Sequence, residues 1–524
     1  MKAHIVGGGF GGLAAAALLI RNAGVSGADI TIYEADEQLG GGYFLGGSAE
    51  SGYNLPGSVF DKYFRCTFDL LKSVPSARNP AISVTEDFFA FNTGEPYDDR
   101  AHIFDRNGRI VAHSPRYGLS LGDGLSLARV LLTPETMLDG RRIDEFFSQR
   151  FFSTEFWLLW STLMGSLPQH SAIEFRRYMD RFLYLFGDLL DMTGVMRTPI
   201  NQHQAFVEPM VAWLRPRGVN FLTGTFVHGI GIAPSTGRIT VDRLDYERGG
   251  AATSVAVAPE DIVLVTTGSQ AADLSAGSMT AAPSPRPSGR SWALWKRLAQ
   301  GRTDFGNPDV FFGAARIPDS LWVTFTVTDT GTEFINQMCA LTGSEAGRGG
   351  LVTLKDSGWV LSLSIFHQPE IIGQPSGTSV WWGYGLYPDN AGAFVKKHMD
   401  QCTGAEILEE TLRQLRFDKQ LDAIMASSIC VPCYMPYVNN IWLPWSRGDK
   451  PPPVPEGATN LGLIGQYIEM PREIAFTIEC SVRSAWEAIY VLLKRGPAPP
   501  PVYQGQYDPK ALFGALKVFL SPPL

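Results

Sequence analysis

The sequence has no excess of basic residues and no long hydrophobic run. Its 44 Lys and Arg against 52 Asp and Glu give a net charge of −8, which argues against a nucleic-acid partner, because such partners require a basic face. The longest later apolar stretch, residues 156–167, is too short to cross a bilayer. Five glycines between positions 7 and 12 interrupt the apolar start of the chain, and no A-x-A site follows, so a signal peptide is not predicted. We expect a cytoplasmic protein.

Cysteine is also scarce, with six residues in 524, so the chain has no disulfide framework. Cys430 and Cys433 form a lone C-x-x-C. A redox pair or half of a metal site is one interpretation, but no second C-x-x-C or His pair completes a tetrahedral site. Two packed free thiols are the favoured interpretation, and no metal site is predicted.

Glycine, in contrast, is abundant, with 55 residues and no Gly-X-Y period. Residues 3–7 read as a short buried strand, residues 7–12 as Gly-Gly-Gly-Phe-Gly-Gly, and residues 13–20 as a helix. A second strand, residues 30–33, ends on Glu34. Strand, Gly-x-Gly-x-x-Gly, helix, strand and acid is the order of a dinucleotide-binding unit, with the pyrophosphate at the helix N-terminus and the acid on the ribose.

Further segments favour FAD over NAD. A second glycine cluster, residues 40–42, follows Glu34, and two apolar strands, residues 262–269 and 460–466, each run into a glycine. A Rossmann-like unit that binds nothing is the alternative. These segments and the strand at Val227 supply the following predicted cofactor-binding residues: Gly7, Gly9, Phe10, Gly11, Gly12, Glu34, Gly41, Gly42, Val227, Thr267, Gly268, Ser269 and Gln466.

The hydrophobic periodicity predicts an α/β FAD-binding Rossmann-like domain, discontinuous in sequence, with an inserted mixed α+β substrate domain and a short helical C-terminus. Helical spacing covers residues 64–71, 143–152, 173–190 and 404–415, and alternation predicts strands at 321–328, 359–366 and 380–386. We assign 1–60, 215–275 and 455–495 to the FAD-binding domain. Residues 61–214 and 276–454 form the substrate-binding regions.

The last segment, residues 496–524, is a Pro-rich linker and an amphipathic helix over residues 510–520. Its apolar stripe is Leu512, Leu516, Phe519 and Leu520. Docking of this helix on its own protein is favoured over peripheral membrane contact, because only two lysines assist lipid contact.

The sequence resembles the oleate hydratases, FAD-containing fatty-acid double-bond hydratases once called myosin-cross-reactive antigens. The resemblance runs from Ile5 to about Leu493 and rests first on Glu174-Phe-Arg-Arg-Tyr-Met-Asp-Arg-Phe182. The other matching stretches are residues 197–202, 218–221, 349–356, 367–369, 382–389, 402–404 and 481–485. The C-x-x-C also belongs to the family pattern.

The resemblance implies a hydro-lyase that adds water to a cis double bond of a long unsaturated fatty acid, with FAD bound and no net redox change. An unactivated alkene needs a placed acid and a held water. The family's proton-donating tyrosine matches Tyr178. The resemblance also places Gly57 and Ser58 beside the flavin.

Two family features are missing. In the family a glutamate orients the water, and the aligned residue in this sequence is Val59. The two arginines near that glutamate align with Ser58 and Leu55. The family contacts its substrate through a Thr-x-Asn-x-x-x-His stretch, and the three named positions align with Ser364, Phe366 and Glu370 in this sequence. The histidine present here, His367, does not align with the family's histidine. We therefore predict Val59, Ser364 and His367 as substrate-binding residues.

Three functions remain open. A divergent hydratase would hold its water with Asp61, with Glu50 or with the backbone near Gly57, and Asp61 is the predicted second catalytic residue. A double-bond isomerase or cyclase would protonate an alkene of another lipid without adding water. A flavin-binding lipid carrier would have no turnover. A flavin oxidoreductase is a more distant alternative. The substrate is a long-chain unsaturated fatty acid or related lipid, and the protein a monomer or homodimer.

Overall fold

Five parallel strands form the sheet that the amino-terminal glycine motif predicts. This computed structural model describes residues 1–93, 100–114, 116–187, 189–192, 194–234, 237–285, 287–348 and 350–520. Of these, Phe519 and Leu520 are described by their backbone alone. The strand order is β19 (Leu461–Ile464), β12 (Ile262–Thr266), β1 (Ala3–Val6), β2 (Ile30–Tyr33) and β8 (Asn220–Leu222). The predicted strands at 262–269 and 460–466 are therefore confirmed as neighbours of the first.

Both faces of this sheet are covered, which explains its apolar strands. Helices α1 (Phe10–Arg21) and α13 (Ile478–Leu493) pack against each other and against the sheet. On the opposite face, Val263 and Val265 share a buried cluster with Val227 and Val241. These belong to a three-stranded antiparallel sheet of β9 (Thr225–Ile232), β10 (Val241–Arg248) and β11 (Ala251–Ala256). Val227 thus lies in the three-stranded sheet, which forms a separate layer on the five-stranded parallel sheet.

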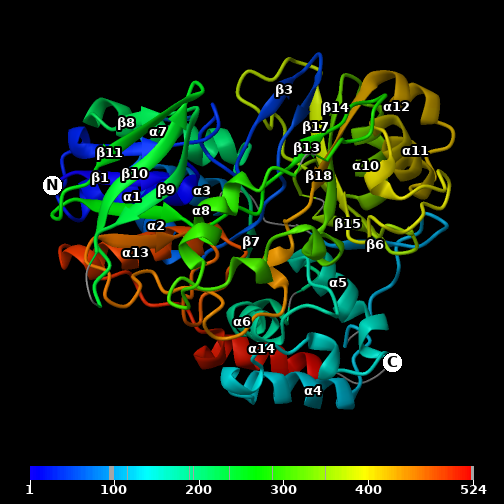
Figure 1. Cartoon of the computed structure of the whole chain (residues 1–524). Coiled ribbons are helices and arrows are strands. Elements are labelled where there is room, and N and C mark those ends of the chain that lie inside the picture. Colours follow the sequence, from blue (N-terminus) through cyan, green and yellow to red (C-terminus); the bar gives the residue numbers. More distant parts are fainter. Residues whose placement is uncertain are drawn as a thin grey trace.

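A second large sheet has seven strands and lies beside the first (Figure 1). Its order is β13 (Ser275–Ala276), β18 (Ser428–Met435), β14 (Trp322–Asp329), β17 (Ser379–Gly385), β16 (Leu361–Ile365), β15 (Leu351–Leu354) and β6 (His102–Phe104). All neighbours are antiparallel except β15 and β6. The three strands predicted from alternation are β14, β16 and β17, at the centre of this sheet.

One group of helices covers the second sheet, and another group forms a separate layer below both sheets (Figure 1). α10 (Glu333–Thr342), α11 (Gly404–Gln414) and α12 (Leu421–Ser427) lie beside the sheet, and the lower layer contains α4 (Leu121–Leu132), α5 (Glu155–Met164), α6 (Ala172–Arg181) and α14 (Pro509–Leu520). The remaining elements are α2 (Arg65–Leu71), α3 (Val84–Thr93), α7 (Glu208–Leu214), α8 (Arg290–Ala299), α9 (Ile317–Ser320), β3 (Gly46–Ser48), β4 (Gly52–Asn54), β5 (Phe60–Asp61) and β7 (Val195–Met196).

Two predicted helices differ in the structure. Residues 143–152 form only two 3₁₀ turns, Ile143–Glu145 and Phe151–Ser153, since the Phe146 amide donates to the Ile143 carbonyl three residues back at 3.0 Å. The amides of Ile143 and Asp144 donate to the carbonyls of His170 and Pro168 and tie this segment to the loop before α6. The predicted helix over 173–190 ends at Arg181 and is followed by a 3₁₀ turn, Leu183–Leu185.

The predicted stripe of α14 is also wrong in part. The helix docks through Ala511, Ala515 and Val518, whereas Leu512 and Leu516 are 47% and 53% exposed. The side chains of Phe519 and Leu520 lie outside the described residues. Helix docking on its own protein is thus observed, but through the neighbouring small-residue face.

The two cysteines of the C-x-x-C lie on β18, three residues apart, so their side chains point to opposite faces of the sheet. Cys430 belongs to one buried cluster and Cys433 to another. Both thiols are free and buried, as the packed-thiol interpretation predicts.

Buried charges hold α6 against the start of α13. Arg181 forms an ion pair with Glu473, and Glu473 also accepts a hydrogen bond of 2.7 Å from Arg483. Arg483 in turn pairs with Glu479 at 2.9 Å. All four side chains are at most 5% exposed. Because water cannot replace any partner, breaking one pair leaves an uncompensated buried charge.

We predict that Glu473→Gln, which keeps the shape and removes the charge, destabilises the fold by about 3–5 kcal/mol. Lys296→Ala is the matched control, because it removes the exposed ion pair with Asp309 (2.6 Å) and should cost at most about 1 kcal/mol. Urea unfolding followed by circular dichroism measures both. Equal effects of the two substitutions would contradict the assigned role of the buried network.

Candidate active site

The glycine turn between β1 and α1 has a conformation that other residues cannot adopt. Gly7 has φ +103°, and a Cβ there would lie 2.6 Å from Thr266 Oγ1. A Cβ on Gly12 would lie 1.9 Å from the Gly7 carbonyl oxygen. The helix therefore begins at Phe10 directly on the turn, capped by Gly9 without a side-chain hydrogen bond. Its exposed amide end is the kind of site that binds a phosphate group.

The second glycine cluster lies directly against the first. The Gly40 amide donates to the Gly8 carbonyl at 2.9 Å, and Gly9 and Gly40 form a β-bridge. A Cβ on Gly41 would lie 3.1 Å from Gly9 Cα. The structure thus brings the predicted residues Gly7 to Gly12 and Gly41 together, with Gly42 next in the chain.

Glu34 lies at the end of β2, beside this turn. Its carboxylate accepts hydrogen bonds from the amides of Gly8 (2.6 Å) and Asp36 (2.9 Å). Burial raises the pKa of Glu34, and these two bonds oppose the shift. The carboxylate has the place that a ribose-binding acid occupies in nucleotide-binding folds.

The loops after β12 and β19 complete this edge of the sheet. Thr266 and Thr267 have buried hydroxyls without a hydrogen-bond partner among the described residues. Gly268 and Gly465 both have positive φ, followed by the predicted residues Ser269 and Gln466 in the chain. Two unsatisfied hydroxyls beside a close-approach glycine turn fit a polar cofactor, because buried hydroxyls otherwise find partners.

Tyr178 lies on α6, buried at 2% exposure. Its ring lies between Trp442, at 4.3 Å between centroids, and Phe182, at 5.9 Å. The hydroxyl oxygen accepts a hydrogen bond of 2.7 Å from the Phe476 amide, which leaves the hydroxyl proton for another acceptor. Burial, with a contribution from Glu174, raises the pKa of Tyr178 well above its ordinary value. The phenol therefore keeps its proton at neutral pH.

The sequence predicted Asp61 as a second catalytic group, and the structure places it next to the buried charges. Asp61 accepts hydrogen bonds of 3.0 Å from the Tyr63 amide and the Tyr184 hydroxyl, and lies 3.8 Å from Arg181. Burial raises the pKa of Asp61 to about 6, and the Arg181 charge opposes this. These contacts support a structural role. Glu50, the other acid considered, is exposed at the β3–β4 turn.

The loop that aligns with the family's catalytic loop is only partly buried. Val59 is 39% exposed, and Leu55 is buried. Gly57 packs on the indole of Trp382, since a Cβ there would lie 2.5 Å from Trp382 Cε3. A valine side chain offers no hydrogen bond to water, so this loop holds no water through residue 59.

Ser58 and His367 line one pocket, although the sequence assigned His367 to the substrate and Ser58 to the flavin. The pocket has about 310 Å³ of empty space, including its open mouth. Its other lining residues are Phe91, Arg197, Thr198, Gln202, Gly347, Phe366 and Glu370. Ser364 contacts the pocket through Arg197, whose Nη1 donates to the Ser364 hydroxyl at 2.5 Å. Val59 is not among the lining residues.

Glu370 is the residue that the sequence showed only as a departure from the family pattern. It is 3% exposed, and burial raises the pKa of its carboxyl well above the usual range, opposed by Arg197. Gln202 Oε1, in the same pocket, is buried without a partner among the described residues. Burial and the charges of Arg78 and Arg348 lower the pKa of His367. The pocket therefore combines a neutral acid, a guanidinium and a neutral imidazole.

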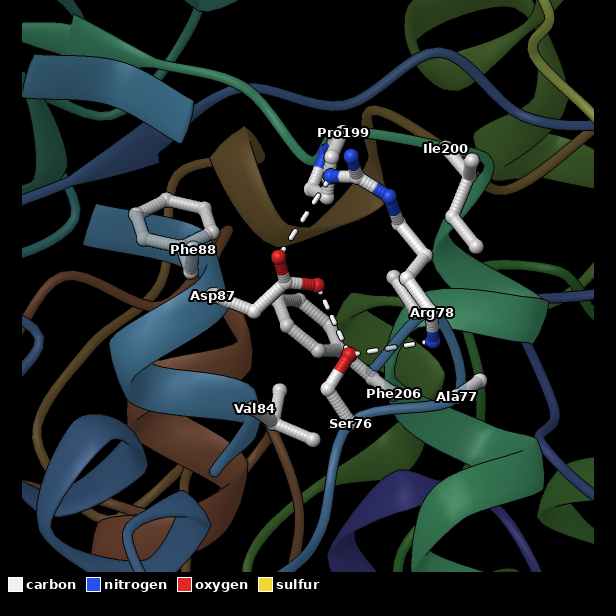
Figure 2. A pocket seen from close by; sticks show the side chains of 10 residues that line it. Ser76, Ala77, Arg78, Val84, Asp87, Phe88, Pro199, Ile200 and Phe206 are labelled. Atoms are coloured by element: carbon white, nitrogen blue, oxygen red, sulfur yellow. Dashed lines mark hydrogen bonds and ion pairs between the residues drawn. The ribbon is translucent and has the colours of Figure 1, made fainter. Parts of the chain in front are cut away.

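A second, smaller cavity lies between α3 and residues 199–206 (Figure 2). Its polar groups bind one another: Asp87 accepts from the Ser76 hydroxyl at 2.7 Å and pairs with Arg78 at 3.5 Å. Phe88 and Phe206 supply its apolar side, and the Phe206 ring packs on Phe10 of the glycine turn at 6.1 Å. Phe206 thus connects this cavity to the glycine turn.

The fold and the glycine edge define an α/β protein with the Rossmann-like fold of dinucleotide-binding proteins. A solved structure with the same fold is cyclohexylamine oxidase from Brevibacterium oxydans IH-35A, with a TM-score of 0.52 and 13% identity over 94% of this chain and 98% of that one. The chain belongs to the MCRA family, whose model matches residues 1–490.

Two curated relatives match over almost the whole chain. The oleate hydratase of Streptococcus pyogenes serotype M49 (strain NZ131) is 32% identical, over 98% of this chain and 89% of that protein. The linoleate hydratase of Lactiplantibacillus plantarum is 29% identical, over 93% of each. The family resemblance seen in the sequence is thereby confirmed.

We predict that Asp61→Asn stabilises the protein at neutral pH and has little effect near pH 4. The folded-state pKa of about 6 lies above the 3.8 of an ordinary aspartate, so the aspartate favours folding only while protonated, and this contribution is lost as pH rises through 6. Asparagine keeps the acceptor for Tyr63 and Tyr184 and does not ionise. Thermal melts between pH 4 and 8 test this. A constant difference in melting temperature across that range would refute the assigned ionisation.

Proposed function

We propose that this protein is a hydro-lyase that adds water to an isolated cis double bond of a long-chain unsaturated fatty acid and forms a hydroxy fatty acid. The observation that carries the proposal is Tyr178, a buried, protonated phenol whose oxygen is held by the Phe476 amide. The names of the two curated relatives, both fatty-acid hydratases, supply the reaction class. The enzyme is FAD-dependent, and the reaction involves no net redox change.

The cofactor edge fits FAD. The amide end of α1 at Gly9, Phe10 and Gly11 would bind the pyrophosphate, and Glu34 the ribose. The unsatisfied hydroxyls of Thr266 and Thr267 are available to the cofactor. Val227, Gly268, Ser269 and Gln466 would contact it, and Gly57 and Ser58 would lie beside the ring system. When bound, the flavin supplies a planar surface and, when reduced, local negative charge.

Tyr178 is the proton donor in this proposal. Its hydroxyl proton passes to one alkene carbon, the oxygen of a water bonds to the other, and the proton that this water then loses returns to the Tyr178 phenolate. The Phe476 amide stabilises the phenolate oxygen through the existing hydrogen bond. The aromatic faces of Trp442 and Phe182 stabilise the transient positive charge.

A row of packed apolar side chains, proposed as the apolar wall for the acyl chain, leads from the pocket to Phe476, whose amide binds the Tyr178 hydroxyl. Phe366, in the pocket, belongs to the same buried cluster as Trp382, Tyr384 and Trp322, and Phe476 packs against that cluster. The ring centroids lie 5.3, 4.3 and 6.3 Å apart along the path from Trp382 through Tyr384 and Trp322 to Phe476. This wall suits an acyl chain, whose burial supplies most of its affinity.

The polar end of the fatty acid would then bind in the pocket. Protonated Glu370 donates a hydrogen bond, and Arg197 supplies the positive charge that balances a carboxylate. Ser58, Ser364 and His367 complete the polar wall. Val59 would contact the chain from the adjoining loop.

A double-bond isomerase or cyclase is the second candidate, favoured by one observation. Val59 stands where the family has its water-orienting glutamate, and a cation that meets no water loses a proton or is trapped internally. A flavin-binding lipid carrier would have no turnover at all. Product analysis separates the three.

The domain division predicted from the sequence is part of this proposal. Residues 1–60, 215–275 and 455–495 would carry FAD, and residues 61–214 and 276–454 the lipid. The observed sheets support this division, because the five parallel strands fall within the first set and the central strands of the seven-stranded sheet within the second.

We also propose that the lower end of the molecule contacts a phospholipid surface peripherally. Leu512, Phe513 and Leu516 of α14 are 47%, 71% and 53% exposed, and Leu125 and Leu132 of α4 are 73% and 83% exposed. Both helices lie at this end (Figure 1), and Lys510 lies at the start of α14. No helix of the described residues is long and apolar enough to span a membrane. The protein would act in the cytoplasm as a monomer or homodimer.

We predict that Tyr178→Phe abolishes turnover and leaves flavin binding intact, because it removes the proton and keeps the ring. Oleic acid and reduced FAD in deuterated water should give, with the wild type, a hydroxy acid that carries one carbon-bound deuterium. Mass spectrometry measures it. Gly12→Val, which fills the cofactor turn, is the control that should lose flavin and activity together. An active Tyr178→Phe protein would refute the proton donor, and a rearranged product without added water would select the isomerase.

We predict that Phe513→Asp weakens binding to phosphatidylglycerol vesicles by roughly 10- to 100-fold, since it removes one buried apolar side chain from the contact. Phe394→Asp is the matched control, because Phe394 is 37% exposed but lies away from the two helices, near α11. Vesicle sedimentation measures both. Equal binding by both variants and the wild type would exclude this end as the membrane contact.

A further inference from the structure

Three buried polar atoms without partners belong to Ser166, at the end of α5, and to Asn439 and Trp322, which pack against Gly165. The helix ends at Gly165, which has φ +72°. A Cβ at this position would lie 3.0 Å from Asn439 Oδ1 and 2.5 Å from Trp322 Cζ2, the ring carbon bonded to the Cε2 atom that carries Nε1. Asn439, Trp322 and Ser166, the residue after Gly165, are 1%, 7% and 0% exposed. Asn439 Oδ1, Trp322 Nε1 and Ser166 Oγ nevertheless have no hydrogen-bond partner among the described residues.

The orientation of the Asn439 amide is fixed. Its Nδ2 donates to the Gly165 carbonyl at 2.8 Å, so the oxygen, not the nitrogen, is the atom left as an acceptor. Gln270 Nε2 donates to the Val438 carbonyl at 2.7 Å and ties this segment to the loop after β12. The position of Asn439 Oδ1 is therefore fixed by two hydrogen bonds, one from its own amide to Gly165 and one from Gln270 to the preceding residue.

Two independent routes connect this group to Tyr178. The amide of Trp442 donates to the Asn439 carbonyl at 3.0 Å, and the Trp442 ring packs on Tyr178 at 4.3 Å. The Trp322 ring packs on Phe476 at 6.3 Å, and the Phe476 amide binds the Tyr178 hydroxyl. The unsatisfied atoms thus lie beside the residues that contact the proton donor.

We propose that Asn439, with Trp322 Nε1 and Ser166 Oγ, binds the water that adds to the double bond, in place of the glutamate that Val59 replaces. This inference rests on the hydratase function proposed above. A buried water typically makes two to four hydrogen bonds to otherwise unsatisfied groups, and this site offers an acceptor, a donor and a hydroxyl.

An amide is sufficient for this role. Asn439 Oδ1 accepts one water proton and the Trp322 N–H binds one lone pair, which leaves the second lone pair for the cationic carbon. The new C–O bond gives a protonated alcohol, which is a strong acid. Its extra proton passes to the Tyr178 phenolate, so the net reaction consumes one alkene and one water and forms one alcohol. No carboxylate base is required.

The test separates water addition from alkene protonation. Asn439→Ala and Trp322→Phe are incubated with oleic acid and reduced FAD in deuterated water, and two products are quantified in the same sample. These are the hydroxy acid and the deuterium in recovered unsaturated acid, which reports protonation by Tyr178 followed by proton loss. We expect hydroxy acid to fall roughly 10- to 100-fold in both variants, the effect of a lost hydrogen bond to the reacting water, with deuterium in the recovered alkene retained.

Asn440→Ala is the matched control. The neighbouring asparagine is equally buried, but its oxygen accepts from the Tyr467 hydroxyl at 2.7 Å and its Nδ2 donates to the Phe311 carbonyl at 2.9 Å. Its loss should leave the ratio of the two products unchanged. A proportional fall of both products in Asn439→Ala and Trp322→Phe, or no fall, would overturn the inference. Absence of hydroxy acid from the flavin-loaded wild type would instead refute the proposed function.

Discussion

The buried ion pair between Arg181 and Glu473 sets the geometry on which the rest of the site depends. Arg181 lies one helical turn after Tyr178 on α6, and Glu473 lies three residues before Phe476, whose amide binds the Tyr178 hydroxyl. Because neither charge can be solvated by water, the two segments must stay together for either charge to be compensated. The same pairing therefore holds the phenol against the Phe476 amide, and Arg483 extends it into α13.

The glycine edge and the pocket proposed for the lipid are linked by residues 57 and 58. Gly57 packs on Trp382, the first ring of the apolar wall, while Ser58 lines the pocket and hydrogen-bonds to Tyr43, whose ring packs on Phe10 at 6.2 Å. Phe476 packs against the same wall and also precedes Thr477, which caps α13. Under the proposed function, a flavin bound at the glycine edge would lie near one end of the path proposed for the lipid chain. A redox cofactor would in this way shape a site in which no electrons are transferred.

Local sequence patterns predicted the parts of the fold that depend on local structure. The turn at residues 7–12 and the strands β12, β14 and β19 were predictable because glycine at positive φ and apolar runs leave direct signals. The helix predicted over 143–152 is wrong because the segment forms two 3₁₀ turns, and its bonds to residues 168–170 leave no local signal in the sequence. Asn439 and Glu370 could not be recognised as site residues, because what distinguishes them, an unsatisfied oxygen and a buried carboxyl, arises from segments far apart in sequence. The face of α14 that docks was mispredicted because small residues pack as closely as large ones.

The central claim is that the Tyr178 phenol protonates the alkene, and its acidity tests this most directly. Site-specific replacement of Tyr178 by 3-fluorotyrosine lowers the pKa of the phenol and changes its shape little. Since burial keeps the pKa of Tyr178 well above its ordinary value, the fluorinated phenol stays protonated and becomes a stronger acid. The account predicts faster oleic acid hydration in single-turnover experiments, with a solvent deuterium isotope effect. An unchanged rate in a protein with intact flavin binding would contradict it.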